Sequence, residues 1–191
     1  MRTKLMQSLL ALAILLAGVA RVSAQQPAAP PPPSKFKLSS PAYTEFSMIP
    51  TQYTCADPNG ASPALQWMNP PNNTASFAVI LHDTDAAPAK GTMDVTHWIF
   101  WNIPATSSQV MAGIKVDATP DGIQQGKNVR GVNGFQPPCP PPGGAPHHYI
   151  FELYALDQKL DIVAGATRAD LLKAMDGHVL GKATYVAVFG R

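Results

Sequence analysis

Charged residues are scarce in this sequence, because Asp, Glu, Lys and Arg together make up 14% of its 191 residues. Hydrophobic residues make up 46%, which excludes an intrinsically disordered chain and is typical of a globular protein with one sizeable core. Neither an internal repeat nor a second linker follows the first 35 residues. We therefore expect a single mostly β domain over residues 36–191.

The signature motifs of several enzyme classes are missing. The sequence has no G-x-S-x-G, no Walker A motif, no dinucleotide-binding glycine fingerprint, no H-E-x-x-H and no C-x-x-C. No motif in the sequence therefore indicates a hydrolase of the G-x-S-x-G type, a nucleotide-binding enzyme, a zinc protease or a thiol oxidoreductase. The histidines also lack the helical or hairpin spacing of metal ligands, so we predict no metal site and no cofactor.

A long hydrophobic run occurs near the N-terminus, at residues 9–20, after the basic residues Arg2 and Lys4. The small residues Val-Ser-Ala at 22–24 then resemble a cleavage site. This pattern predicts a secretory signal peptide at 1–24 and an exported protein, periplasmic or secreted. The alternative is an uncleaved anchor, although the run is short for a bilayer span.

Removal of this leader changes the charge balance. The whole chain has a formal net charge of +2, but the leader holds three basic residues and no acid, which leaves eleven basic against twelve acidic residues. That balance offers no basic stripe for nucleic acid and no polybasic membrane patch. Residues 25–35 (QQPAAPPPPSK) then predict an extended proline-rich tether, or alternatively a ligand for another domain.

Cysteine is rare as well, since Cys55 and Cys139 are the only two. An even number of cysteines in an exported chain permits one disulfide. Two buried free thiols would give the same sequence, so both alternatives stay open here.

Short apolar runs bounded by Pro, Gly and Asp make up most of the remaining chain, and this pattern favours strands over helices. The spacing suggests a mostly antiparallel β domain with one or two helices packed at its edge. The predicted strands are 36–40, 64–67, 76–82, 96–103, 149–156 and 184–189.

One helix is indicated after Thr167, because Asp170 follows at the spacing of a capping box and Gly177 is a plausible stop. Its apolar face is predicted to consist of Leu171, Leu172, Met175 and Val179.

Four of the five histidines lie at or beside predicted strand ends. His82 and Asp83 end one strand, His97 opens the next, and His147 and His148 open a third. If these strands share a sheet, several of the groups converge at one edge, where imidazole donors can hold an oxyanion such as phosphate.

Three further residues extend this hypothetical pocket: Asp85 lies two residues after Asp83, and Trp98 and Tyr149 would back the histidines. Side chains alternate along a strand, so His147 and Tyr149 share a face that His148 does not. The alternative is structural, because aspartates commonly cap turns and a strand histidine can be a satisfied core residue.

Five segments, in chain order, resemble the phosphatidylethanolamine-binding protein family in its bacterial YbhB/YbcL branch, also called Raf kinase inhibitor-like. Each segment alone is a weak signal, but all five in order are specific. They are YTCADPNGASPALQW (53–67), FAVILHDTDAAP (77–88), HWIFWNIPA (97–105), GFQPPCPPPGGAPHHYIFELYALD (134–157) and GATRADLLKAMDGHVL (165–180).

This resemblance implies a large antiparallel sheet packed on a smaller one, with short helices near the C-terminus. It also implies a pocket for a small anion such as phosphate or a phospholipid head group. Carried over by position, the ligand-binding residues are Asp83, His97, Pro140, His147 and Tyr149.

The sequence departs from the family pattern around this pocket. Gln136 and Pro137 replace two glycines, Phe135 lacks a tyrosine hydroxyl, and His148 stands where the family usually has arginine. Histidine offers a titratable charge in place of a permanent one. We therefore expect ligand binding to be weaker at neutral pH and to tighten below about pH 6.5.

Three functions compete at this point. The first is an exported binding protein that holds a small anion. The second is a phosphoester or acyl hydrolase that uses the Asp and His side chains as acid and base. The third is a secreted inhibitor or interaction protein with an unknown protein partner, by analogy with kinase-regulating relatives.

Overall fold

The computed structural model describes residues 35–116, 119 and 122–191. The predicted signal peptide and all of the predicted tether except Lys35 lie outside the described residues. Among the described residues, no helix is long and apolar enough to cross a membrane.

Two antiparallel sheets form the described domain. The larger has five strands in the order β6-β4-β3-β7-β8, and the smaller has three in the order β1-β2-β5. The strands of the larger sheet are β3 (Ser76–Asp83), β4 (Val95–Pro104), β6 (Gln124–Gln125), β7 (His147–Leu156) and β8 (Val179–Phe189). Those of the smaller sheet are β1 (Lys37–Ser39), β2 (Leu65–Met68) and β5 (Gln109–Val110).

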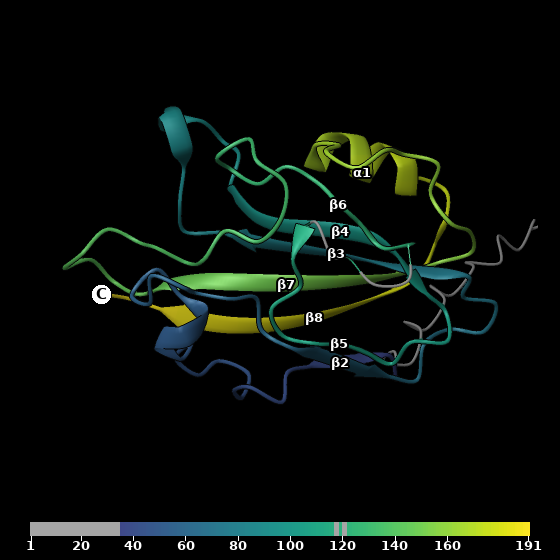
Figure 1. Cartoon of the computed structure of the whole chain (residues 1–191), viewed down its shortest axis with the longest axis horizontal. Helices are drawn as coiled ribbons and strands as arrows, with labels where there is room; N and C mark the ends of the chain where they lie inside the picture. The colour runs from purple at the N-terminus through teal and green to yellow at the C-terminus, as the bar shows by residue number, and fades with distance from the viewer. Residues whose placement is uncertain (1–34, 117–118, 120–121) are drawn as a thin grey trace, which may run out of the picture. The chain divides into compact units, whose positions relative to one another are not determined.

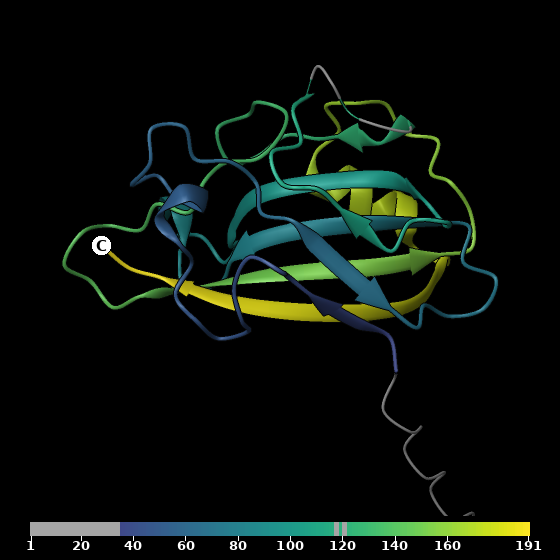
Figure 2. The same ribbon diagram turned by 60° about the horizontal axis from the view of Figure 1, so that its bottom comes forward.

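The larger sheet is covered on both faces. Figures 1 and 2 show the smaller sheet on one face and helix α1 (Arg168–Met175) on the other. Every residue of the central strand β3 is buried, which explains why its sequence is a continuous apolar run rather than an alternating one. Alternate residues of β3 enter two separate cores: Phe77, Val79 and Leu81 face the smaller sheet, and Ala78 and Ile80 face α1.

The six predicted strands are all present, and the predicted helix is α1. Its capping box forms as expected: the Asp170 N–H donates to the Thr167 hydroxyl at 3.2 Å, and the Thr167 N–H donates to the Asp170 carboxylate at 2.9 Å. The predicted apolar face is wrong in part, because Leu172 is 42% exposed and Val179 begins β8. The helix is shorter than the apolar pattern suggested, so only Leu171 and Met175 reach the core.

Cys55 and Cys139 form a disulfide across 84 residues of sequence. Cys55 follows the short 3₁₀ helix η1 (Thr51–Tyr53), and Cys139 lies in the loop before β7. The Cys55 N–H also donates to the Pro138 carbonyl at 3.0 Å. The bridge therefore joins two loops that are far apart in the sequence.

Replacement of both cysteines by serine should lower the free energy of unfolding by about 3–5 kcal/mol, because a long loop is then free to expand in the unfolded state. Urea unfolding of the variant and the oxidised wild type measures the difference. Dithiothreitol should destabilise the wild type and leave the variant unaffected. Equal stability of the oxidised wild type and the variant would contradict this assignment of the bridge.

Candidate anion-binding site

The end of β3 and the beginnings of β4 and β7 meet at one end of the larger sheet. Asp83 is the residue paired with both Val95 of β4 and Tyr149 of β7. This register follows from antiparallel pairing on both sides of β3, and it brings the polar residues at these strand ends together, as expected from their positions in the sequence.

A β-bulge in β4 positions His97. Trp98 pairs with Leu81, whereas Thr96 pairs with His82, so that His97 is the extra residue on its strand. Regular alternation would place His97 and Trp98 on opposite faces. The bulge instead turns the His97 ring toward Tyr149 on the inner face, with ring centroids 5.2 Å apart, while Trp98 stays in the inner core.

The two adjacent histidines of β7 have different partners. His147 Nδ1 lies 2.8 Å from Asp83 Oδ2, and both side chains are largely buried. His148 is exposed on the other side of the strand, where its N–H and its Nδ1 both contact Asp85 Oδ2, at 2.6 and 2.9 Å. This backbone hydrogen bond and the His148 ring lower the pKa of Asp85.

A cavity of about 250 Å³ lies at this end of the sheet. Its polar lining comes from separate parts of the chain, and prolines of the segment before β7 form much of the apolar lining. The polar residues that line it are Asp83, His97, Arg130, Gln136 and His147, and the prolines are Pro137, Pro140 and Pro141.

Arg130 and Gln136 are functional candidates that the sequence did not reveal. Arg130 is exposed in the loop between β6 and β7, where its N–H donates to Asn128 Oδ1 at 2.9 Å. Asn128 is buried and in turn donates from Nδ2 to the Gly134 carbonyl at 3.0 Å. No strand or helix pattern marks this loop, and its approach to the cavity depends on a contact with β4, where the Val129 N–H donates to the Thr96 carbonyl at 2.8 Å.

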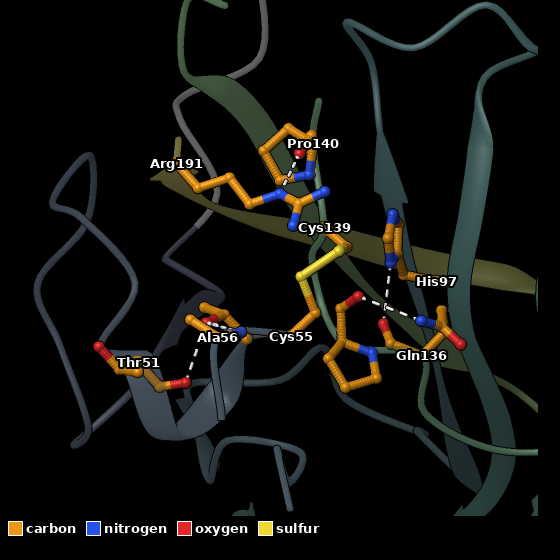
Figure 3. Close-up of a disulfide and its surroundings, with 10 residues drawn as sticks. Thr51, Cys55, Ala56, His97, Gln136, Cys139, Pro140 and Arg191 are labelled. Atoms are coloured by element: carbon orange, nitrogen blue, oxygen red, sulfur yellow. Dashed lines mark hydrogen bonds between the residues drawn. A yellow bond between two sulfur atoms is a disulfide. The ribbon is translucent and has the colours of Figure 1, made fainter. Parts of the chain in front are cut away.

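The proline segment, residues 134–146, is anchored at several points (Figure 3). Its Gln136 N–H donates to the His97 carbonyl at 2.8 Å, and the Gln136 carbonyl accepts from His97 Nδ1 at 2.8 Å. Cys139 is held by the disulfide, and the Pro140 carbonyl accepts from Arg191 Nε at 2.6 Å. Gly143 adopts φ 77°, a conformation suited to glycine, where the segment turns back toward β7.

Burial changes the ionisation of the inner residues. It lowers the pKa of His97 below its usual 6.5, more than the Gln136 carbonyl and the Asp83 charge raise it. His97 is therefore neutral at pH 7. Burial and the nearby charge of Asp83 raise the pKa of Tyr149 well above its usual range, so its hydroxyl stays protonated. Tyr149 interacts with the Asp83 carboxylate and the Cys139 backbone, and it is not among the residues that line the cavity, so its contact with a ligand stays a prediction.

The remaining candidates from the sequence lie elsewhere. Trp98 packs in the inner core, where its Nε1 donates to Gln125 Oε1 at 2.7 Å, so its suggested role in the pocket is not supported. Asp85 and His148 pair with each other beside the cavity rather than among its lining residues. His82 lies on the opposite face of β3, with Nδ1 2.5 Å from Asp94.

Within the described residues, no group of three or more His, Cys, Asp or Glu side chains is arranged to hold a metal ion.

The lowered pKa of His97 predicts a loss of stability in acid. Below pH 6.5 His97 binds a proton in the unfolded chain but stays neutral in the folded chain. Unfolding is therefore accompanied by proton uptake, and the free energy of unfolding falls as the pH falls toward the folded-state pKa. The slope from this one group is at most about 1.4 kcal/mol per pH unit. Urea unfolding from pH 7.5 to 5.5 should therefore show a steeper loss for the wild type than for His97→Gln; identical slopes would contradict the assignment.

Comparison with protein-family models gives one match, described as phosphatidylethanolamine-binding protein, over residues 39–190. A UPF0098 protein of Methanothermobacter thermautotrophicus is 41% identical over 155 residues, which cover 81% of this chain and 98% of that protein. A candidate lipoprotein of Mycobacterium tuberculosis, LppC, is 34% identical over 168 residues, 88% of this chain and 78% of that protein.

Solved structures give the same result. Escherichia coli YbcL, described as a member of the mammalian PEBP family, superposes with a TM-score of 0.74 at 31% identity, over 82% of this chain and 98% of that one. The PEBP homologue CT736 of Chlamydia trachomatis also gives a TM-score of 0.74, at 32% identity over 83% and 99% of the two chains. The family model over residues 39–190, the sequence identity to these relatives and the matching fold establish that this chain belongs to the phosphatidylethanolamine-binding protein family.

Proposed function

We propose that this protein is an exported binding protein whose cavity beside Asp83, His97 and His147 holds a small anion, such as phosphate or the head group of a phospholipid. The observation that carries the proposal is the convergence of His97, His147 and Arg130 on one cavity. These groups come from β4, β7 and the loop between β6 and β7.

The size of the cavity favours a small ligand. Pockets for drug-sized molecules usually enclose about 300–1,000 Å³, whereas this cavity encloses about 250 Å³. A single phosphate group fits such a volume, but the acyl chains of a lipid would have to stay outside. The prolines and the disulfide fix the wall of the cavity, so little conformational entropy is lost when a ligand binds.

Export rests on other observations. The leader at 1–24 has the pattern of a signal peptide, and a disulfide such as Cys55–Cys139 persists in oxidising compartments. The relative LppC is described as a candidate lipoprotein, which is consistent with a location outside the cytoplasm.

The hydrolase hypothesis has less support. An imidazole oriented by a carboxylate, as in the Asp83–His147 pair, is a suitable general base. The described residues that line the cavity, however, include no serine or threonine, and the sulfur of their one cysteine, Cys139, is in the disulfide. A binding role requires only the donors and charges described above.

Substitution of His97 or His147 by alanine should weaken the binding of inorganic phosphate by about 10- to 100-fold, because each removes a polar side chain that lines the cavity and is available to the charged ligand. Isothermal titration calorimetry measures the affinity. His178→Ala is a matched control, because His178 pairs with Asp157 at the other end of β7. Undiminished binding by folded His97→Ala and His147→Ala proteins would argue against the proposed site.

The position of His148 predicts a pH effect on phosphate affinity. Its ring contacts Asp85, and an imidazole in its protonated form offsets the charge of a carboxylate beside it. The gain in affinity from pH 7.5 to pH 6.0 should therefore be larger in the wild type than in His148→Arg, whose charge is permanent. Calorimetry of both proteins at the two pH values measures this difference, and an identical pH dependence would exclude the role of His148.

A further inference from the structure

Both histidines of the cavity have their proton positions fixed by neighbouring acceptors. The Gln136 carbonyl, 2.8 Å from His97 Nδ1, can only accept a hydrogen bond, so Nδ1 carries the proton. Asp83 Oδ2 lies 2.8 Å from His147 Nδ1 and likewise accepts. In the neutral state, each ring therefore offers an unprotonated Nε2, which is an acceptor and not a donor.

The donors that remain are placed differently. Arg130 carries a permanent positive charge and lines the cavity, and the Gln136 side-chain amide, whose Nε2 already donates to the Pro137 carbonyl at 3.4 Å, has one further N–H to offer. A ligand must therefore accept hydrogen bonds from these groups and donate one to a histidine nitrogen. A fully deprotonated oxyanion satisfies only the first requirement, because it would face the Nε2 lone pair of neutral His97 and the Asp83 carboxylate.

We propose that the cavity selects a tetrahedral oxyanion that carries its own proton, so that inorganic phosphate binds in preference to sulfate and to phosphodiesters. This inference rests on the proposed function, since it concerns the same site. Hydrogen phosphate has an OH group that can donate to Nε2 of His97 or His147, and its other oxygens can accept from Arg130. Sulfate has the same shape and charge but no proton at neutral pH, and a phosphodiester has no proton either.

When the ligand carries no proton, His97 could take one up from the solvent instead. The surroundings of His97 make this proton uptake unfavourable. The groups around it are Asp83 and His82 of β3, His147 and Tyr149 of β7, and Arg130 of the neighbouring loop. Burial disfavours the imidazolium form of His97 more than the Asp83 charge favours it. An anion without a proton must either overcome this cost or leave a buried hydrogen-bonding group unsatisfied.

The experiment compares inorganic phosphate, sulfate and dimethyl phosphate by isothermal titration calorimetry at pH 7.5. Dimethyl phosphate represents a phospholipid diester head group, and so separates a lipid source from free phosphate. We expect sulfate and dimethyl phosphate to bind at least about 10-fold more weakly than phosphate. Repeating the titrations in two buffers of different ionisation enthalpy should show that sulfate binding takes up more protons than phosphate binding.

The outcomes separate the two proposals. If phosphate binds and sulfate binds equally well, the selectivity is overturned while the anion-binding function stands. If dimethyl phosphate binds as well as phosphate, the selectivity is also overturned and a diester head group becomes the favoured ligand. If none of the three anions binds, both the function and the inference are overturned.

The variant Asp83→Asn tests the proton positions directly. Asp83 Oδ1 accepts the Asp85 N–H at 3.0 Å, a role that only the oxygen of an asparagine amide can take. The amide NH₂ would then face His147 Nδ1 and move the ring proton to Nε2. That ring becomes a donor, so the preference for phosphate over sulfate should shrink by about 10-fold.

Two measurements make this variant decisive. The ¹⁵N chemical shifts of the His147 ring should report the change of tautomer, and circular dichroism verifies the fold. Asp85→Asn removes a neighbouring carboxylate but leaves the Asp83–His147 contact in place, so it should change both affinities by the same factor. A folded Asp83→Asn protein that keeps the wild-type preference would overturn the inference.

Discussion

The site depends on one irregularity in the backbone, the bulge in β4 at His97. Because His97 is the extra residue in its strand, its ring lies on the same side as Asp83 and Tyr149. The same residue then pairs with Gln136 through two hydrogen bonds, one from its ring and one to its carbonyl. The bulge therefore positions the histidine, fixes its tautomer and attaches the proline segment to the sheet.

The proline segment acts as a rigid wall because its attachments come from three other parts of the chain. The disulfide joins it to the loop at Cys55, Arg191 holds the Pro140 carbonyl, and His97 holds Gln136. Proline has a fixed φ and no N–H, so such a segment can line a cavity without unsatisfied donors. The fold itself thus holds the wall of the cavity in place.

The larger sheet also separates its polar groups by face. Asp83 and His147 lie on the inner face, whereas His82 pairs with Asp94 on the outer face beneath α1. His82 and Asp83 are adjacent in sequence, yet the pleat of β3 assigns them to different networks. His82 and Asp83, which are neighbours in the sequence, thus have separate partners: Asp83 pairs with His147 at the cavity, and His82 pairs with Asp94 on the face that α1 covers.

The sequence alone determined six of the eight strands in the described residues, the capping box of α1 and the opposite sides of β7 taken by His147 and His148, because these follow from local patterns of period two and of helix ends. The two-residue strands β5 and β6 are too short to carry such a pattern. Antiparallel neighbours of β3 were enough to bring Asp83 and His147 together. Tertiary structure decided the rest. The bulge that turns His97 inward, the approach of Arg130 and the choice of a disulfide over free thiols all depend on contacts between residues far apart in the chain. No local periodicity encodes such contacts, and the hydrogen-bonding roles of the two imidazoles follow only from them.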